Sequence, residues 1–471
     1  MVDKIKFGTD GWRAIIAKEF TVENVGRVAE ATANWLLKSR GSSPSVVLGH
    51  DCRFAGELFC NTIAHVLCSK GVKVFIAKGF VSTPMISLGA VNLKTDIGII
   101  ITASHNPPEY NGFKLKGWYG GPLLPAMVEE IEKLIPDHCT LQLNDLPLEE
   151  YRTKNLLIDT DLETMYTDHV IKNFNLDAIR KSGMKLAYDA MYGSGMNVMK
   201  RILPELNMLH CDYNPSFMGQ APEPIHKNLT EFSNMIKNAN GKISSGLVTD
   251  GDADRLGFYD AQGNFVDSHH IILLLIHYLV NYKGMRGKVC TAFSTTPKVA
   301  ILCKHYGLEI QTVKIGFKYI AEIMISEDVL LGGEESGGIA IKGHIPERDG
   351  IWMGLTLWEF MATSGKTLND LIAEVYAIVG KFSFERNDVH LKEEVKQQIL
   401  ENCKAGKYKQ FGKYKVARIE DLDGYKYFFE NGDWMMIRAS GTEPVLRLYA
   451  ESASKDAAFD ILNDSKATLL N

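Results

Sequence analysis

Apolar positions along the chain follow two alternating patterns. Short uninterrupted apolar runs, such as 97–101, are typical of buried strands, whereas 21–38 repeats apolar residues every three or four positions, as an amphipathic helix does. In this first part, strands are expected at 45–48, 72–77 and 95–101, and helices at 21–38 and 55–69. Strand and helix in alternation predict a parallel sheet covered by helices.

The same alternation recurs twice further along. A second series has expected strands at 184–189, 208–213 and 246–249 and helices at 197–203 and 232–238. A third has strands at 288–293, 309–313 and 329–331 and helices at 297–306 and 317–326. After Thr367 the segments 414–419, 425–429, 434–437 and 446–450 alternate like antiparallel strands, and a helix is expected at 455–469.

We therefore expect an α/β fold with three successive similar α/β domains, built on mixed, mainly parallel sheets, and a C-terminal α+β domain, arranged around one central cleft. The expected domains are 1–155, 156–258, 259–370 and 371–471. A chain of 471 residues is too long for a single core, which agrees with several domains. The stretch 363–367 is the expected hinge of the last domain.

The composition of the chain argues against nucleic-acid, membrane and zinc binding. With 45% hydrophobic and 23% charged residues the chain is an ordinary globular protein, and its net charge of −5 provides no basic field for nucleic acid. The longest apolar stretch, 271–280, is too short to cross a bilayer, and the first residues lack the apolar core of a signal peptide, so we expect a cytoplasmic protein without membrane contact. The eight cysteines include no Cys-x-x-Cys pair, which favours buried free thiols over a zinc site.

The first stretch with candidate chemistry follows the strand expected at 95–101. Two prolines and a glycine exclude a helix from 102–116, so we expect a loop that holds Ser104, His105, Lys114 and Lys116 at the carboxyl end of a strand. Ligands bind at such edges in open α/β sheets. His105 or Lys114 could activate the Ser104 hydroxyl or neutralise a phosphate on it. Taken alone, a Ser–His pair is more often an ordinary polar turn.

Three aspartates follow the strand expected at 246–249. Asp250, Asp252 and Asp254 are so close that their carboxylates repel each other unless a hard cation lies among them, and magnesium is the natural candidate. A calcium EF-hand is excluded because its sixth and twelfth positions require Gly and Glu, where this chain has Arg255 and Ala261. A solvated acidic turn is the alternative, although it gives no reason for the adjacent Arg255.

Two later loops carry groups suited to a phosphosugar. Glu334 and Ser336, between glycines, could accept hydrogen bonds from a vicinal diol, although a helix cap fits that segment equally well. Near the C-terminus two arginines enclose amide and hydroxyl donors, a combination that binds phosphate oxygens. These residues are Arg438, Ser440, Gly441, Thr442 and Arg447.

The four loops, in this order, resemble those of the α-D-phosphohexomutase family. The motifs are Thr-Ala-Ser-His-Asn-Pro at 102–107, Asp-x-Asp-x-Asp-Arg at 250–255, Gly-Glu-x-Ser-Gly at 333–337 and Arg-x-Ser-Gly-Thr-Glu-Pro at 438–444. The resemblance implies that Ser104 carries a transferable phosphoryl group and that an oxygen of phosphorylated Ser104 and the three aspartates surround Mg²⁺. It also implies that Glu334 and Ser336 bind sugar hydroxyls and that the last loop binds phosphate.

Within the family the chain looks most like a phosphoglucomutase. The resemblance implies interconversion of α-D-glucose 1-phosphate and glucose 6-phosphate, with glucose 1,6-bisphosphate as activator and intermediate and a small phosphosugar as partner. Lys114 is our candidate for the general acid or base, on the argument that nearby cations lower its pKa; His105 is the alternative, and Arg13 and Arg255 would assist. The chain could be a monomer or a homodimer.

Several other functions stay open. A dual phosphomannomutase/phosphoglucomutase and a phosphoglucosamine mutase share the same four loops, and a sugar phosphatase or a non-catalytic sugar-phosphate sensor are more distant alternatives. Glucose preference is expected because His344, Arg348 and Lys318 could contact the sugar ring or the distal phosphate. The sugar motif also resembles that of the glucose-selective branch, because the dual mannose/glucose branch usually carries a different residue at the position of Glu335.

Overall fold

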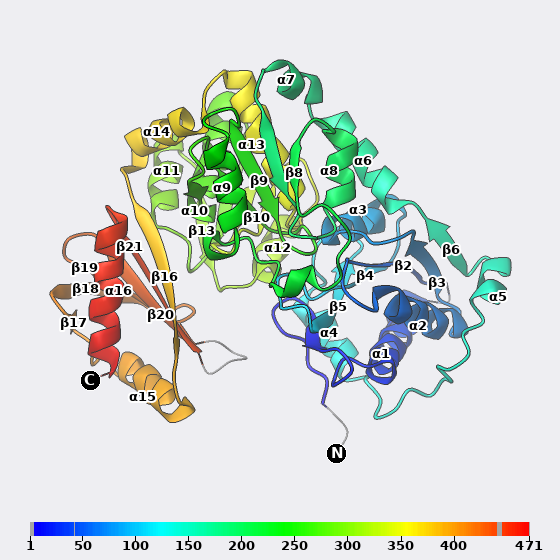
Figure 1. The fold of residues 1–471 in the computed structure, drawn as a ribbon. Helices are drawn as coiled ribbons and strands as arrows, with labels where there is room; N and C mark the ends of the chain where they lie inside the picture. The colour runs from blue at the N-terminus through cyan, green and yellow to red at the C-terminus, as the bar shows by residue number, and fades with distance from the viewer. Residues whose placement is uncertain (1–3, 42, 440–444, 471) are drawn as a thin grey trace.

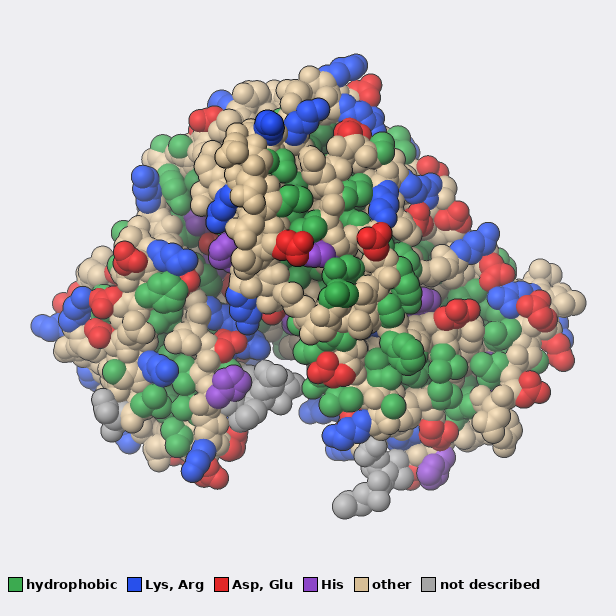
Figure 2. All heavy atoms as spheres, viewed as in Figure 1, with side chains coloured by type: hydrophobic (Ala, Val, Ile, Leu, Met, Phe, Trp, Pro, Cys, Tyr) green, Lys and Arg blue, Asp and Glu red, His purple; other side chains and the backbone are tan. Residues whose placement is uncertain are grey.

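The computed structural model describes residues 4–41, 43–439 and 445–470 (Figure 1). Four sheets follow each other along the chain. In Figure 1 the first domain lies at the right, the second and third domains form the centre and top, and the fourth domain lies at the left. Figure 2 shows the first and fourth domains as two lobes with an open cleft between them, which confirms the expected central cleft.

The first sheet has six strands in the order β1-β5-β4-β2-β3-β6. Its strands are β1 (Trp12–Ile15), β2 (Ser45–His50), β3 (Lys73–Ala77), β4 (Ile97–Ile101), β5 (Tyr110–Gly117) and β6 (Leu157–Thr160). Its helices are α1 (Val22–Arg40), α2 (Gly56–Ser69), α3 (Thr83–Asn92), α4 (Pro125–Glu132) and α5 (Leu148–Thr153). The Thr21 side chain caps α1 by accepting a hydrogen bond from Asn24 N, as helix-start chemistry predicts.

The second and third sheets repeat this plan with fewer strands, in the orders β11-β10-β9-β7-β8 and β13-β12-β14-β15. The second domain consists of α6 (Leu162–Asn173), α7 (Leu176–Lys181), β7 (Leu186–Asp189), α8 (Met196–Ile202), β8 (Asn207–Leu209), α9 (Thr230–Asn238), β9 (Ser245–Thr249), β10 (Leu256–Tyr259) and β11 (Phe265–Val266). The third consists of α10 (Ser268–His277), β12 (Lys288–Ala292), α11 (Lys298–Tyr306), β13 (Ile310–Val313), α12 (Phe317–Ser326), β14 (Val329–Gly333), β15 (Ile339–Ile341), α13 (Gly350–Ser364) and α14 (Leu368–Val379).

The repeat is clearest where each domain carries its polar loop. In all three, a strand that pairs in parallel with its neighbour (β4, β9 or β14) leads through a loop into an antiparallel strand (β5, β10 or β15). We call these connections the serine loop (102–109), the aspartate loop (250–255) and the glutamate loop (334–338). The mixed sheets therefore present the three loops at equivalent sheet edges.

One sequence expectation about these loops is wrong. Lys114 and Lys116 lie not in a loop but on β5, where they pair with Ile100 and Gly98 of β4. The alternation of Phe113 and Leu115 with the two lysines is the period of a strand, and it directs both amines to one face of the sheet.

The fourth sheet is antiparallel, with strand order β16-β21-β20-β19-β18-β17. Its elements are β16 (Ser383–His390), α15 (Glu393–Lys404), β17 (Gln410–Phe411), β18 (Tyr414–Glu420), β19 (Tyr425–Phe429), β20 (Trp434–Ala439), β21 (Val445–Ser452) and α16 (Lys455–Leu470). This confirms the expected change of architecture after the third domain.

One apolar cluster, the shared core, spans the first three domains. The first domain also has a second core of its own, and the fourth domain has a separate core. A single cluster joins Val47 of the first sheet, Leu247 of the second and Leu331 of the third, with the almost fully buried helix α13 among them. A small aromatic cluster, including Phe293 of the third domain and Trp434 of the fourth, covers the contact between those domains. There, Lys426 Nζ also donates to the carbonyls of Phe293 and Thr295.

Helix α14, which follows the stretch expected to be the hinge, packs with the third domain. Leu368, Leu371 and Val379 of this helix belong to the shared core, so Gly365 joins two helices of the third domain. The chain passes into the fourth sheet between Val379 and Ser383, about fifteen residues after the stretch expected to be the hinge. The first sheet likewise continues to Thr160 and the second to Val266, a few residues beyond the boundaries drawn from sequence.

Two further sequence expectations bear on the general character of the chain. The cysteines are unpaired, and all are buried except Cys139, which is half-buried, as expected for free thiols. Among the described residues, every helix is too short or too polar to cross a bilayer.

Candidate functional site

Ser104 lies at the end of β4 in a buried and strained position. Its φ is +51°, a left-handed value that favours glycine, so its surroundings must hold it there. The Ser104 hydroxyl donates to Asp250 Oδ2 at 2.7 Å and lies 3.3 Å from His105 Nδ1. Its backbone N–H donates to Thr102 Oγ1 at 2.8 Å. The serine therefore points from the first domain into the aspartate loop of the second.

A single buried guanidinium holds the serine loop in shape. Arg53 donates to the carbonyl oxygens of Ser104 and Asn106 at 2.6 Å each, Pro107 at 2.8 Å and Tyr110 at 2.9 Å. The sequence analysis did not assign this role to Arg53. Every residue has a backbone carbonyl, so the residues that Arg53 contacts carry no sequence signal for the contact. For Arg53 itself, the one visible signal was the Asp-Cys-Arg sequence at 51–53.

The three aspartates form a buried carboxylate cluster. One oxygen from each of Asp250, Asp252 and Asp254 lies within 4.8 Å of the others. Burial and the two neighbouring carboxylates raise the pKa of Asp250 far above its usual range. Within the part of the chain that the structure describes, Oδ1 of Asp252 and Oδ1 of Asp254 are buried without a hydrogen-bond partner. Unpartnered, buried carboxylate oxygens at this spacing fit a hard divalent cation.

Lys114 lies among these carboxylates. Its Nζ is 2.7 Å from Asp252 Oδ2, 3.2 Å from Asp254 Oδ2 and 2.8 Å from Asp10 Oδ2. Burial disfavours the charged amine, but the three carboxylates outweigh it and raise the pKa of Lys114 above its ordinary value. The expectation that nearby cations lower this pKa is therefore wrong for this structure, because carboxylates surround the amine.

His105 is close to cations, in contrast to Lys114, which is close to carboxylates. Burial, together with Arg255, Arg13 and Lys114, lowers the pKa of His105 well below its usual value. The imidazole is therefore neutral at pH 7, and its Nδ1 is the atom within reach of Ser104 Oγ. Arg13 donates to Asn106 Oδ1 at 2.6 Å, and Arg255 Nε lies 3.9 Å from Asp254 Oδ1. The structure thus brings all the predicted catalytic and metal-binding residues together.

Asp10 is a site residue that the sequence-based prediction missed. Its Oδ2 accepts from Arg348 at 2.5 Å and from Lys114, and Arg13 lies 3.8 Å away. Burial opposes ionisation, yet the surrounding cations hold the pKa of Asp10 well below its usual range. Asp10 thus ties the N-terminal turn to the serine-loop strand and to the third domain. The glycine-rich turn that holds it was visible in the sequence, but its carboxylate was not assigned.

The glutamate loop only partly follows the prediction. Glu334 is buried and accepts a hydrogen bond from Gly316 N at 2.9 Å, and burial raises its pKa. Arg348 binds Asp254 Oδ2 at 2.7 Å in addition to Asp10, so it joins the metal and N-terminal groups. Ser336 is half-buried in the same loop, and Lys318 lies in the first turn of α12, where its Nζ is over the Tyr319 ring.

His344 does not fit its predicted role as a sugar ligand. Its side chain is fully buried and its Nε2 is bonded to Asp349 Oδ2 at 2.9 Å. The ring stacks on Trp352 at 3.7 Å, and Nδ1 lies 3.3 Å from His169 Nε2. His344 is therefore used in packing between the second and third domains. From the sequence it was only a polar residue close to the sugar motif, and its contacts could not be predicted.

The phosphate-binding prediction falls partly on residues that the structure does not describe. Ser440, Gly441 and Thr442 lie outside the described residues. Arg438 and Arg447 pair directly across β20 and β21, so their side chains leave the same face of the sheet, and Arg438 Nε lies 3.5 Å from Asp423 Oδ1. Like charges held this close favour an anion between them.

Sequence models of the four domains of one family match this chain in order. They are described as phosphoglucomutase/phosphomannomutase α/β/α domain I at 4–139, domain II at 164–263, domain III at 267–379 and the C-terminal domain at 392–465. The chain belongs to the phosphoglucomutase/phosphomannomutase family. This confirms the predicted family, and with it an isomerase that transfers a phosphoryl group within a sugar phosphate.

The relatives of this chain are named as mutases of different phosphosugars. A phosphoglucomutase/phosphomannomutase from Thermococcus kodakarensis is 29% identical over 97% of this chain and 96% of its own. A phosphoglucosamine mutase from Methanococcus maripaludis is 31% identical over 88% of this chain and 89% of its own. A crystal structure from Thermus thermophilus, provisionally assigned as a phosphomannomutase, has 32% identity and a TM-score of 0.87, and each chain is covered completely.

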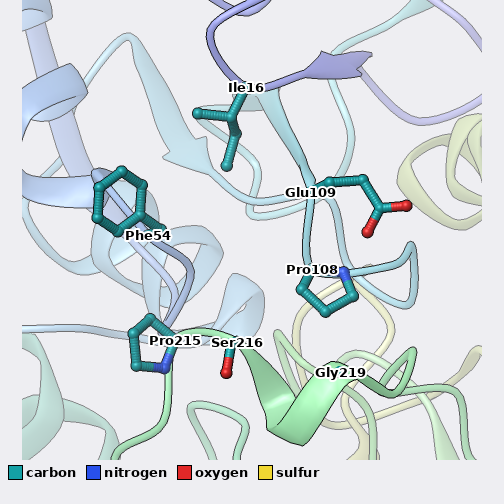
Figure 3. A pocket seen from close by; sticks show the side chains of 7 residues that line it. All are labelled: Ile16, Phe54, Pro108, Glu109, Pro215, Ser216 and Gly219. Atoms are coloured by element: carbon teal, nitrogen blue, oxygen red, sulfur yellow. The ribbon is translucent and has the colours of Figure 1, made fainter.

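A hollow of about 510 Å³ lies beside the serine loop but apart from this cluster (Figure 3). Figure 3 shows Phe54 of the first domain at the left, Pro108 and Glu109 of the same domain at the right, and Pro215 of the second domain below them. Its lining is mostly apolar and includes none of the residues bonded to Ser104 Oγ. The hollow and the charged cluster around Ser104 are therefore separate features of the structure.

Proposed function

We propose that this protein interconverts α-D-glucose 1-phosphate and glucose 6-phosphate, with Ser104 as the phosphoryl carrier and glucose 1,6-bisphosphate as the intermediate. The observation that carries the proposal is the contact of Ser104 Oγ with Asp250 Oδ2 at 2.7 Å. It places the hydroxyl of the serine loop directly against the carboxylate cluster. A phosphoryl group on that oxygen would meet the aspartate loop and the cations around it.

The residues of the cluster would divide the work of phosphoryl transfer. Asp250, Asp252 and Asp254 would hold Mg²⁺, which when bound withdraws charge from the transferring phosphoryl group. Lys114, whose raised pKa keeps it charged but makes it a weaker acid, would donate a hydrogen bond to the sugar oxygen. His105, neutral and 3.3 Å from Ser104 Oγ, would orient the hydroxyl or accept its proton.

The other loops would hold the sugar and its second phosphate. Glu334 and Ser336 would accept hydrogen bonds from ring hydroxyls, and Arg438 and Arg447 would hold the phosphate that is not reacting. Because the bisphosphate must turn around between its two transfers, the fourth domain must open and close. Its separate core and small contact with the third domain support such a movement.

A phosphoglucosamine mutase or a dual mannose/glucose enzyme is the second candidate, since the relatives carry those names. His344 and Glu335, which the family resemblance linked to glucose, are engaged by Asp349 and Ser294 and contribute no support for glucose preference. The glucose assignment therefore rests on the overall resemblance of the loops.

Parallel assays distinguish these candidates. Glucose 1-phosphate, mannose 1-phosphate and glucosamine 1-phosphate are each incubated with Mg²⁺ and a trace of the matching 1,6-bisphosphate, and formation of the 6-phosphate is followed. The proposal expects kcat/KM for glucose to exceed that for mannose by about tenfold, a difference of about 1.4 kcal/mol. A clear preference for glucosamine would assign the protein to amino-sugar synthesis, and equal rates for glucose and mannose would make it a dual enzyme.

A further inference from the structure

The two adjacent glutamates of the glutamate loop make contacts on different sides. Glu334 accepts from Gly316 N within the third domain. The Oε2 of Glu335 instead accepts from Ser294 Oγ at 3.0 Å, and its backbone carbonyl accepts from Ser268 Oγ. Its Oε1 lies 3.9 Å from an amine of Arg386 on β16. The second glutamate thus connects the loop to the fourth domain.

Arg386 continues this connection within the fourth sheet. Its Nε and Nη2 donate to the two oxygens of Asp388 at 2.7 and 2.6 Å, a bidentate pair that fixes the plane of the guanidinium. The remaining amine of Arg386 is the one that faces Glu335. Tyr449, its cross-strand neighbour on β21, has its ring 5.8 Å from the guanidinium carbon.

Asp388 connects Arg386 to Arg447 of β21. In the register of β16 and β21, Asp388 is paired with Arg447, and such pairs have adjacent side chains. Arg447 is in turn paired with Arg438 on β20. A row of alternating charge therefore runs from Glu335 through Arg386 and Asp388 to Arg447, joining the loop that would hold the sugar to the arginine that would hold its distal phosphate.

We infer that Arg386 is a positioning residue that couples the glutamate loop to Arg447 and limits how soon the fourth domain opens, so that the bisphosphate turns without leaving the enzyme. This rests on the proposed function. The contact of Glu335 with Arg386 suits a bond that forms and breaks in each cycle. The two side chains are 12% and 30% exposed and 3.9 Å apart, so separating them does not leave a fully buried charge without water.

The inference predicts that glucose 1,6-bisphosphate escapes from the enzyme more often when the contact between Glu335 and Arg386 is lost. If the coupling is weakened, the domains open sooner and the bisphosphate leaves before it has turned, so the enzyme depends more strongly on added bisphosphate. Transfer at Ser104 does not involve Arg386 and should change little. A defect in folding or in chemistry would lower kcat without this selective dependence.

Arg386→Gln is the test variant, and Arg418→Gln is its matched control. Arg418 lies in the same domain on β18, where its side chain is 56% exposed and paired with Glu420. Mutase rate is measured against the concentration of added glucose 1,6-bisphosphate. Arg386→Gln should raise the half-maximal bisphosphate concentration by about tenfold while kcat at saturation falls by less than about threefold. Arg418→Gln should match the wild type in both.

Glu335→Gln provides an independent variant should Arg386→Gln fold poorly. It should raise the bisphosphate requirement as well, and the double variant should be no worse than the more severe single variant, because both remove one contact. A bisphosphate requirement in Arg386→Gln and Glu335→Gln equal to that of Arg418→Gln would overturn the inference while leaving the mutase function intact. A wild-type protein without mutase activity would instead refute the proposed function.

Discussion

Replacement of Arg53 by lysine separates the geometry of the serine loop from its charge. The guanidinium donates to four carbonyl oxygens of the loop and its flanks, and its Nε is 3.4 Å from the buried carboxylate of Asp51. Lysine keeps the positive charge beside Asp51 but has three donors on one atom, so at least one carbonyl loses its partner. We expect Arg53→Lys to fold and to hold Ser104 less well.

The size of the effect follows from the bonds lost. A hydrogen bond to a charged group contributes about 1.5–3 kcal/mol, so the loss of one such bond should reduce the free energy of unfolding by about 2 kcal/mol. The strained backbone of Ser104, with φ of +51°, persists only while its neighbours hold it. If poorer alignment of the Ser104 hydroxyl raises the activation free energy by the same 2 kcal/mol, kcat falls by about 30-fold, with a change in KM below about threefold.

Arg27→Lys is the control in this experiment. Arg27 is also a buried arginine of the first domain, but it donates to Pro136 O and Asn24 Oδ1, away from the serine loop. Urea denaturation and steady-state kinetics are measured for both variants. Both should be less stable than the wild type, and Arg53→Lys alone should lose kcat. Equal kcat in the two variants would show that Arg53 only stabilises the domain and would refute the argument about alignment.

Three further predictions concern metal, pH and phosphate. Mg²⁺ at about 100 times its Kd should stabilise the wild type by about 2.7 kcal/mol, visible as a higher Tm, whereas Asp250→Asn should show no shift; an equal shift in both would remove Asp250 from the metal site. Burial lowers the pKa of His269 to about 4, below its ordinary value of 6.5, so its contribution to stability is present above pH 6.5 and is lost as pH falls through 4. His269→Asn, which keeps an acceptor for Thr296 N but takes up no proton, should show a smaller fall in Tm between pH 6.5 and 4, and an unchanged fall would contradict this assignment. Arg447→Ala should raise KM for both the 1-phosphate and the 6-phosphate through loss of about 1.5–3 kcal/mol, and an effect on one isomer alone would contradict shared use of the site.

The sequence predicted best what local patterns encode. Amphipathic helices such as α1 and α12 were placed to within two residues, and the strands that end at the serine and aspartate loops were found because they are short apolar runs bounded by polar motifs. Helices α10 and α13 were not predicted, because they are buried almost all round and carry no contrast between faces.

Prediction of the site was limited in a similar way. Motifs identified the residues that differ chemically from their surroundings, such as Ser104 and Asp250. They could not show which partners the fold supplies from a distance: Asp10 reaches Arg348 across more than 300 residues, and Arg53 acts on carbonyl groups that every residue possesses. The pKa of Lys114 was predicted in the wrong direction for the same reason, since its carboxylate neighbours come from other loops.

Whether Ser104 carries the phosphoryl group is tested most directly by intact-mass analysis of the protein after exposure to glucose 1,6-bisphosphate and Mg²⁺. The account predicts one added phosphate on the wild type, which is lost on incubation with glucose 6-phosphate, and no added phosphate on Ser104→Ala. A Ser104→Ala protein that still gains the phosphate, or that turns over hexose phosphate at the wild-type rate, would contradict it.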